Sequence, residues 1–377
     1  MANKGGLEGI IVADVTTSLV DGVEGKLIYS GYTIGDLAEN ALFEEVVFLL
    51  WRTRLPNQAE LDALMKEING AALPDGIISL MKGLPKDADP MAVLRTAVSA
   101  LAHYDADGEN LTDKEVAERK AARLTGQITA ITAAWGRIRK GEEPVAPRAD
   151  LNLAENFLYQ LTDADPDETA AKAINAYLVL LAEHGMNAST FCTRVVTATG
   201  SDMHSAVVGG IGTLKGPAHG GANAAAMKMF LEIGSADNVE KWFDDNIKNG
   251  DRRIMGIGHR VYKAPDPRAA VLKERAEALA ASSGNKQWFD VATKLEEAAR
   301  ADDYFIDRKL FPNVDYYSAI VLYTLDLDVD MFTPIFAMAR IAGWSANIID
   351  QMAGRLIRPK ANYVGPKDLE WTAVSDR

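Results

Sequence analysis

Apolar residues recur at helical spacing along most of the chain, and only the N-terminal region departs clearly from this pattern. Two short β-prone runs, residues 17–20 and 26–29, surround the turn signals Asp21-Gly22 and Gly25, which predicts a small hairpin. Almost every apolar stretch after it follows the spacing of an amphipathic helix. The pattern therefore predicts an all-α fold with a small N-terminal β-hairpin.

Capping residues predict where several helices begin. Asn40 is a suitable N-cap for a helix that runs through Leu50. Thr112 and Glu115 have the spacing of a capping box ahead of a long helix that ends near Arg139.

The most complete helix signal lies at residues 165–185. Asp165 is the expected N-cap, Glu168 follows three residues later, and Gly185 is the expected stop. His184 would then lie on the last turn, where the negative end of the helix dipole favours a protonated imidazole. Such a cation would suit an anionic substrate, although a histidine that caps helix-end carbonyls would occupy the same position.

A second helical stretch, residues 206–214, contains Gly209, Gly210 and Gly212. Glycines weaken an isolated helix, so their presence favours a place where another backbone approaches closely. A subunit interface is the expected location.

The composition changes along the second half of the chain. Charged residues become more frequent after Gly216-Pro217, and an apolar pattern resumes at residues 316–323. We therefore expect a smaller domain at residues 216–322. It would close against a larger helical domain built from residues 1–215 and 323–377.

Composition and charge narrow the classes of function. The 377 residues are 48% hydrophobic, enough for a large core. No apolar stretch is long enough to span a bilayer, and the start MANKGGLEG lacks the features of a secretory signal, so a cytoplasmic location is expected. A net charge of −13 disfavours nucleic acid and anionic membranes as partners. The single cysteine, Cys192, cannot form an internal disulfide, and no Cys/His cluster has zinc spacing, so no metal is expected.

The segment GPAHGGAN, residues 216–223, sets His219 in a glycine-rich turn just before an alanine-rich helix start. A helix N-terminus disfavours a positive imidazole, so His219 would stay neutral and could donate an N–H to a developing oxyanion. A structural histidine in an ordinary turn is the alternative.

The segment GIGHRVYKAPDPR, residues 256–268, carries His259 behind two glycines and is followed by basic residues. Glycines allow a ligand to approach the backbone, and arginine or lysine could bind phosphate or carboxylate. The segment lacks the spacing of a P-loop or of a dinucleotide fingerprint, and a solvated charged turn would explain it equally well.

Asp315, in PNVDYYS, lies between Val314 and two tyrosines. An apolar setting would raise the pKa of its carboxyl toward that of a useful general base. An N-cap for a helix that begins at Tyr316 is the competing interpretation.

Arg340 lies within a strongly apolar helical run, so its guanidinium needs a partner. A substrate carboxylate or an internal salt bridge would each serve. Arg358, in RLIRP, would by itself be interpreted as surface charge.

Several segments occur in the order and approximate spacing of the citrate synthase family. They are EHGMNASTF at residues 183–191, GPAHGGAN, GIGHRVYKAPDPR, PNVDYYS and the region of Arg340 and Arg358. The resemblance begins at DGVEGKLIYSGYTIGDLA, residues 21–38, and covers nearly the whole chain. It implies a two-domain, all-helical homodimer whose large domain forms the dimer interface and whose small domain closes over the active site.

The resemblance also implies a role for each matched residue. Asp315 is similar to the base that deprotonates the acetyl-CoA methyl, His219 to the donor on the thioester oxygen, and His259 to the residue that polarises the oxaloacetate carbonyl. Oxaloacetate-binding positions correspond to His184, Arg268, Arg340 and Arg358, the last contributed across the dimer. Acetyl-CoA is then a substrate and no cofactor is expected. The candidate CoA contacts are Gly256, Ile257, Gly258, Arg260 and Lys263.

The chain departs from the common family pattern at a few positions. Asn347 and Asp350 replace a frequent histidine and glutamate, Ile257 replaces an aromatic residue, and Gly185-Met186 replaces Glu-Leu. A 2-methylcitrate synthase, which accepts propionyl-CoA, resembles the chain in the same motifs. Two other classes also stay open, a metal hydrolase that uses the two histidines and Asp315 as ligands, and a non-catalytic binding protein.

Overall fold

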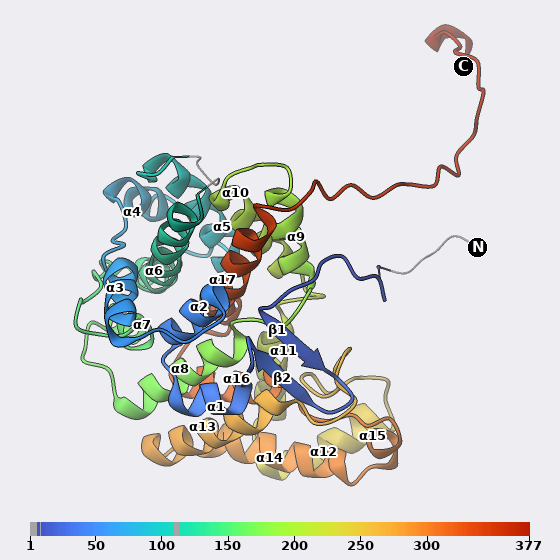
Figure 1. Ribbon diagram of the computed structural model, residues 1–377. Helices are drawn as coiled ribbons and strands as arrows, with labels where there is room; N and C mark the ends of the chain where they lie inside the picture. Colours follow the sequence, from blue (N-terminus) through green and yellow to red (C-terminus); the bar gives the residue numbers. More distant parts are fainter. Residues whose placement is uncertain (1–5, 8, 109–112) are drawn as a thin grey trace.

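The computed structural model describes residues 6–7, 9–108 and 113–377. Within them, seventeen α-helices and one small three-stranded sheet form the fold (Figure 1), which confirms the predicted all-α class. No helix of this described part is both long and apolar enough to cross a membrane.

The sheet is the predicted hairpin with a short third strand added. It consists of β1 (Ser18–Asp21), β2 (Lys26–Tyr29) and β3 (Tyr32–Thr33), all antiparallel. The register pairs Ser18 with Tyr29 and Asp21 with Lys26, so residues 22–25 form the tip of the hairpin.

Ten helices precede residue 216. They are α1 (Ile34–Asn40), α2 (Phe43–Arg52), α3 (Gln58–Asn69), α4 (Asp75–Lys82), α5 (Pro90–Leu101), α6 (Lys114–Ile138), α7 (Leu153–Thr162), α8 (Glu168–Leu181), α9 (Ala188–Thr197) and α10 (Met203–Leu214).

Seven helices follow. They are α11 (Ala222–Ile233), α12 (Val239–Phe243), α13 (Pro267–Ser283), α14 (Gln287–Arg300), α15 (Asp303–Asp307), α16 (Val314–Thr324) and α17 (Phe332–Gln351). The helices α11 to α16 occupy the part of the chain predicted as the small domain, although a boundary at residue 322 would fall inside the last turn of α16.

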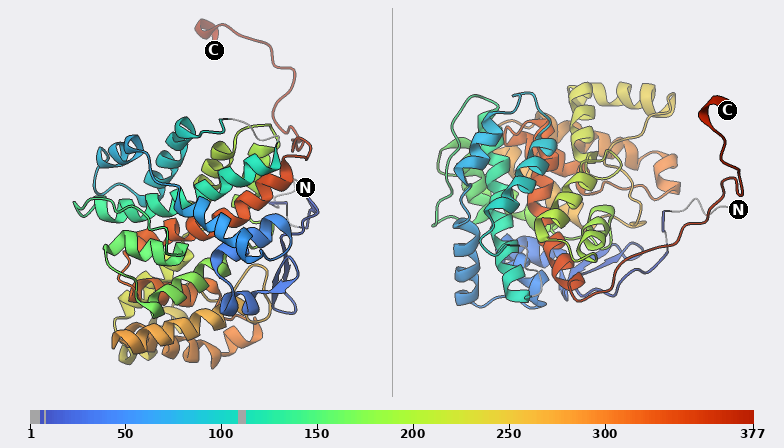
Figure 2. Two further views of the ribbon diagram at one scale, coloured as in Figure 1. Left: turned by 60° about the vertical axis from the view of Figure 1, so that its left-hand side comes forward. Right: turned by 90° about the horizontal axis from the view of Figure 1, so that it is seen from above.

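Helix α17 is the central element of the larger group of helices. Nearly all of its residues are buried, and it packs against α2, α6, α8, α9 and α10 (Figures 1 and 2). An apolar helix surrounded on all sides in this way has little freedom to shift. Any polar side chain on α17 is therefore held in a fixed position.

Two of the predicted helix starts are wrong. Asn40 ends α1, where its side chain donates to the Asp36 carbonyl, and α2 begins only at Phe43. Asp167, rather than Asp165, caps α8. The reasons differ: Asn40 already belongs to α1, whereas Asp167 offers the same capping carboxylate two residues after Asp165.

The predicted capping box at Thr112 lies outside the described residues. Asp113 is the N-cap of α6, and its carboxylate accepts the N–H groups of Glu115 and Val116.

Two of the three glycines in α10 face the same chain rather than solvent. A Cβ at Gly209 would meet Cys192 of α9, and one at Gly210 would meet Trp344 of α17. Close packing within the chain therefore accounts for Gly209 and Gly210, and the subunit interface stays a prediction.

The C-terminal segment after α17 leaves the helical body and runs away from it (Figures 1 and 2). Its large apolar side chains are exposed, namely Leu356, Tyr363, Val364, Leu369, Trp371 and Val374.

Candidate active site

Most of the predicted site residues converge, although they come from five separate segments. The rings of His184 and His259 lie 5.4 Å apart, and Tyr262 lies 4.9 Å from His259. Arg268 and Arg340 are close enough to influence the ionisation of the histidines and of Asp315. The fold thus forms one buried, cation-rich site.

Asp315 lies in the first turn of α16, but it does not cap the helix. Asn313 is the N-cap, and its Oδ1 accepts the Asp315 N–H at 2.8 Å. Burial raises the pKa of Asp315 to about 6, although the charge of Arg268 opposes that rise. The carboxyl thus has the pKa expected of a general base near neutral pH.

The segment before α16 also fixes the glycine loop that carries His259. Gly258 donates to the Phe311 carbonyl, and Asn313 donates to the carbonyls of Gly256 and Gly258 at 2.8 and 2.7 Å. These bonds hold His259 close to the start of α16, where Asp315 lies.

The ring of His259 is held in one tautomer. Its Nδ1 lies 3.0 Å from the N–H of Val261 and 3.2 Å from that of Tyr262, and it accepts from both. Burial, with the charge of Arg268, lowers the pKa of His259 to about 4. A neutral ring that accepts at Nδ1 must carry its proton on Nε2, so Nε2 is available as a donor.

His219 lies in the turn before α11, and its Nε2 is 2.8 Å from the Ser189 hydroxyl. Burial lowers its pKa to about 4, assisted by the charge of Arg340. The prediction of a neutral His219 is confirmed, but burial rather than the helix dipole is the main cause.

Ser189 supports His219 and was missed from the sequence. It also accepts from Trp344 Nε1 at 3.0 Å and lies 2.8 Å from Asn187 Oδ1. A hydroxyl has only one proton to donate. If Ser189 donates it to His219 Nε2, the proton of the neutral ring lies on Nδ1, and if Ser189 donates it to Asn187, the ring proton lies on Nε2. In the sequence Ser189 looks like an ordinary residue of a helix start.

The predicted protonation of His184 is wrong. Helix α8 ends at Leu181, so His184 lies beyond its last turn. Burial lowers the pKa of His184 well below its ordinary value, and the positive charges of Arg268 and Arg340 lower it further. Nε2 of the neutral ring lies 3.1 Å from the Tyr262 hydroxyl oxygen.

Two of the arginines predicted to bind oxaloacetate, Arg268 and Arg340, are buried, but their surroundings differ. Arg268 forms an ion pair with Asp266 at 2.8 Å. Arg340 donates through Nε to the Leu181 carbonyl at 2.8 Å, and among the described residues no carboxylate oxygen lies within 4.0 Å of its guanidinium. A direct internal salt bridge therefore does not explain Arg340 in this part of the chain.

A buried carboxyl nearby partly balances the charge of Arg340. Burial raises the pKa of Glu183 to about 7, while Arg340 lowers it. Asn347, one of the departures from the family pattern, lies 3.5 Å from Glu183 and accepts from Arg194. Asn347 therefore connects α17 to α9 and contacts a carboxyl at the edge of the site.

Arg358 is not brought to this site within one chain. It is exposed and lies in the C-terminal segment beyond α17. Its predicted role therefore requires a second subunit.

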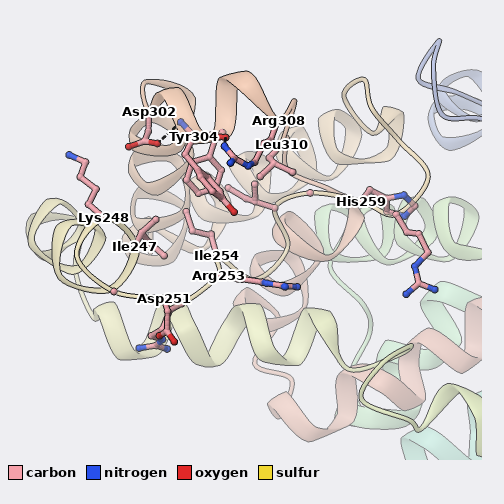
Figure 3. Close-up of a pocket in the computed structure, with 16 residues that line it drawn as sticks. Ile247, Lys248, Asp251, Arg253, Ile254, His259, Asp302, Tyr304, Arg308 and Leu310 are labelled. Carbon is pink, nitrogen blue, oxygen red and sulfur yellow. Dashed lines mark hydrogen bonds between the residues drawn. The ribbon is translucent and has the colours of Figure 1, made fainter. Parts of the chain in front are cut away.

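A cavity of about 930 Å³ opens beside His259 (Figure 3). Of the predicted CoA contacts, Ile257, Gly258 and Arg260 line it, whereas Gly256 and Lys263 do not. Gly256 is instead packed against the backbone of Tyr316.

The basic lining of the cavity was largely missed from the sequence. Its side chains include Lys248, Arg252, Arg253 and Arg308, and the Arg308 guanidinium lies 4.0 Å from the Tyr304 ring centre. Lys248, Arg252 and Arg253 belong to one charged stretch and Arg308 to another, and neither stretch has a recognisable motif.

The described residues contain no group of three or more His, Cys, Asp or Glu side chains arranged to hold a metal ion. In particular, His219, His259 and Asp315 do not form such a group.

Comparison with known proteins agrees with the fold. The family model for the citrate synthase C-terminal domain matches residues 6–360. A citrate synthase from Haloferax volcanii is 44% identical over 381 residues, covering 99% of each chain. A 2-methylcitrate synthase from Mycobacterium tuberculosis is 39% identical, covering 96% of this chain and 90% of that protein.

A solved structure of citrate synthase from Thermoplasma acidophilum, a ternary complex with carboxymethyl coenzyme A and oxaloacetate, is also similar. It superposes with a TM-score of 0.92 at 34% identity, covering 99% of this chain and 98% of that chain. The chain belongs to the citrate synthase family. It is accordingly a Claisen-type condensing acyltransferase.

Proposed function

We propose that this enzyme condenses acetyl-CoA with oxaloacetate and water to give citrate and CoA. The observation that carries the proposal is a buried carboxyl, Asp315, with a pKa near 6, that shares one cationic site with the neutral rings of His219 and His259. The similar Thermoplasma acidophilum structure, which holds oxaloacetate and a CoA derivative, supports the same substrates.

In the first step Asp315 removes a proton from the methyl group of the thioester. That methyl is a very weak carbon acid, so the enolate oxygen must be stabilised as it forms. His219 donates a hydrogen bond to this oxygen. His219 Nε2 faces Ser189, so the donor to the substrate is Nδ1, which carries the ring proton when Ser189 donates to Nε2.

In the second step the enol carbon attacks the ketone of oxaloacetate. His259 donates from Nε2 to the ketone oxygen, while Arg268 and Arg340 bind the carboxylates and His184 completes the contacts. A dianion offsets the buried positive charge of the arginines. Water then hydrolyses the citryl thioester, and closure of residues 216–322 over residues 1–215 and 323–377 excludes water until that step.

The cavity beside His259 is our candidate for the CoA moiety. Five lysine and arginine side chains line it, and the stacked pair of Arg308 and Tyr304 offers a flat surface for a ring next to a positive charge. Its position next to His259 would bring the acyl end of a CoA thioester toward Asp315.

We also propose that the active form is a homodimer. The C-terminal segment exposes six large apolar side chains, which is unfavourable unless another surface covers them. A second copy would cover them, and in this arrangement Arg358 would enter the active site of the partner.

The alternative function is that of a 2-methylcitrate synthase. One methylene in an apolar pocket changes discrimination by only about 1–3 kcal/mol. The similarity to the enzyme from Mycobacterium tuberculosis supports this alternative.

The condensing activity predicts thiol release that depends on Asp315. Purified protein with oxaloacetate and acetyl-CoA should release free CoA, and Asp315→Asn should reduce kcat by at least about 10²-fold because the general base is lost. Propionyl-CoA in the same assay distinguishes the two synthases. A folded wild-type protein that releases thiol from neither substrate would contradict the proposal.

The ionisation of Asp315 predicts an acid limb in the pH profile. A base acts as its anion, so kcat/KM should fall as the pH drops through about 6. His219 and His259 stay neutral in this range because their pKa values lie near 4. Glu183, with a pKa near 7, is the competing group. The limb should therefore persist in Glu183→Gln, and its loss there would assign it to Glu183 instead.

The candidate CoA cavity predicts a selective effect of Arg308→Ala. Loss of one charged contact should raise KM for acetyl-CoA roughly tenfold, since 1.4 kcal/mol corresponds to a factor of ten. KM for oxaloacetate should not change. Arg300→Ala is the matched control, because Arg300 is paired with Glu296 on α14 and does not line the cavity. An unchanged KM for acetyl-CoA in Arg308→Ala would place CoA elsewhere.

The proposed dimer predicts complementation between two inactive variants. A mixed dimer of Asp315→Asn and Arg358→Ala chains has one site with both residues intact. Refolding the variants together at equal amounts should therefore recover about a quarter of the wild-type activity. If Arg358 served its own chain, both sites of the mixed dimer would be defective and no activity would return.

A further inference from the structure

The N-terminal hairpin connects two segments of the candidate oxaloacetate site. At its base, the Tyr29 hydroxyl donates to the Glu183 carbonyl at 2.7 Å and accepts the Glu183 N–H at 3.1 Å. Ser18 accepts the Gly185 N–H at 3.1 Å. These contacts fix the residues on either side of His184.

The tip of the same hairpin contacts the loop between His259 and Arg268. The Lys263 N–H donates to the Gly22 carbonyl at 2.8 Å. A Cβ at Gly22 would lie only 2.2 Å from the Val261 carbonyl oxygen, and one at Gly25 would lie 2.9 Å from that of Pro265. Backbone therefore packs directly on backbone, which only glycine permits.

The contacted loop residues orient two site histidines. The N–H groups of Val261 and Tyr262 hold His259 Nδ1, and the Tyr262 hydroxyl lies 3.1 Å from His184. A shift of the loop would move both rings and would weaken the bonds that keep the His259 proton on Nε2. The hairpin tip therefore contacts the loop, and the loop in turn holds the two rings.

The turn at the tip is ordered by its own side chain. Asp21 Oδ1 accepts the N–H groups of Val23 and Glu24, each at 2.9 Å. This bonding holds Gly22 in position against the loop.

We propose that the hairpin tip, Asp21 with residues 22–25, is a positioning element for oxaloacetate. It sets the distance between the segment that carries His184 and the loop that carries His259, Tyr262 and Arg268. Gly22 and Asp21 are its determining residues. This inference rests on the proposed use of the site for oxaloacetate.

Gly22→Ala tests the inference. Gly22 does not have a positive φ, so alanine can adopt its backbone conformation and the obstacle is the Val261 carbonyl. The loop must move, and KM for oxaloacetate should rise at least tenfold, toward the roughly hundredfold cost of a 1 Å misplacement. KM for acetyl-CoA should change much less.

Gly35→Ala is the matched control. Gly35 lies in α1, has no positive φ, and has no atom of the described residues within 4 Å of a built Cβ. Its kinetics should equal those of the wild type. The increase in melting temperature on adding oxaloacetate should be equal in Gly35→Ala and wild type but smaller in Gly22→Ala.

Asp21→Ala is a second test, and it removes a side chain rather than adding one. It can therefore be measured even if Gly22→Ala does not fold. Loss of the turn bonds should raise KM for oxaloacetate between about two- and tenfold. Asp21→Asn keeps an acceptor and should restore the wild-type value.

Two results would overturn the inference. One is an unchanged KM for oxaloacetate in folded Gly22→Ala and Asp21→Ala, and the other is an equal rise in KM for both substrates, which indicates a general loss of structure. If the wild type itself shows no turnover and no thermal response to oxaloacetate, the proposed function fails and the inference fails with it.

Discussion

Two arginines buried in one site impose the constraint on which the rest of the site depends. Arg268 and Arg340 are each only 2% exposed, and a buried charge is costly unless it is paired. Asp266 pairs with Arg268, while Glu183 influences Arg340 without a direct bond. Among the described residues Arg340 is therefore left without a direct carboxylate partner, and a substrate carboxylate could take that place.

The charges of Arg268 and Arg340, together with burial, also determine which neighbouring groups are ionised. Burial disfavours any charged form, and the arginines oppose further positive charge, so both effects keep His184, His219 and His259 neutral. For Asp315 the two effects act in opposite directions, because burial raises its pKa and Arg268 lowers it. One environment can therefore hold neutral donors and a base that is ionised near pH 7.

The sequence predicts the local features well, because they depend on local signals. The hairpin follows from β-prone runs around Asp21-Gly22, and the glycine-rich turns identify His219 and His259. The features that it does not predict arise from contacts between distant segments. His184 is neutral because it is buried and because Arg268 and Arg340 add positive charge nearby, and Ser189 supports His219 across 30 residues. Neither effect has a signature in the chain.

NMR of the unliganded protein labelled with ¹⁵N-histidine can determine the protonation state of each histidine in the site. The chain has only five histidines, so single substitutions can assign them. We expect His184, His219 and His259 to be neutral at pH 7, with the proton of His259 on Nε2. A protonated His219 or His259 at that pH would contradict this expectation, because burial and the nearby arginines could not then keep the rings neutral.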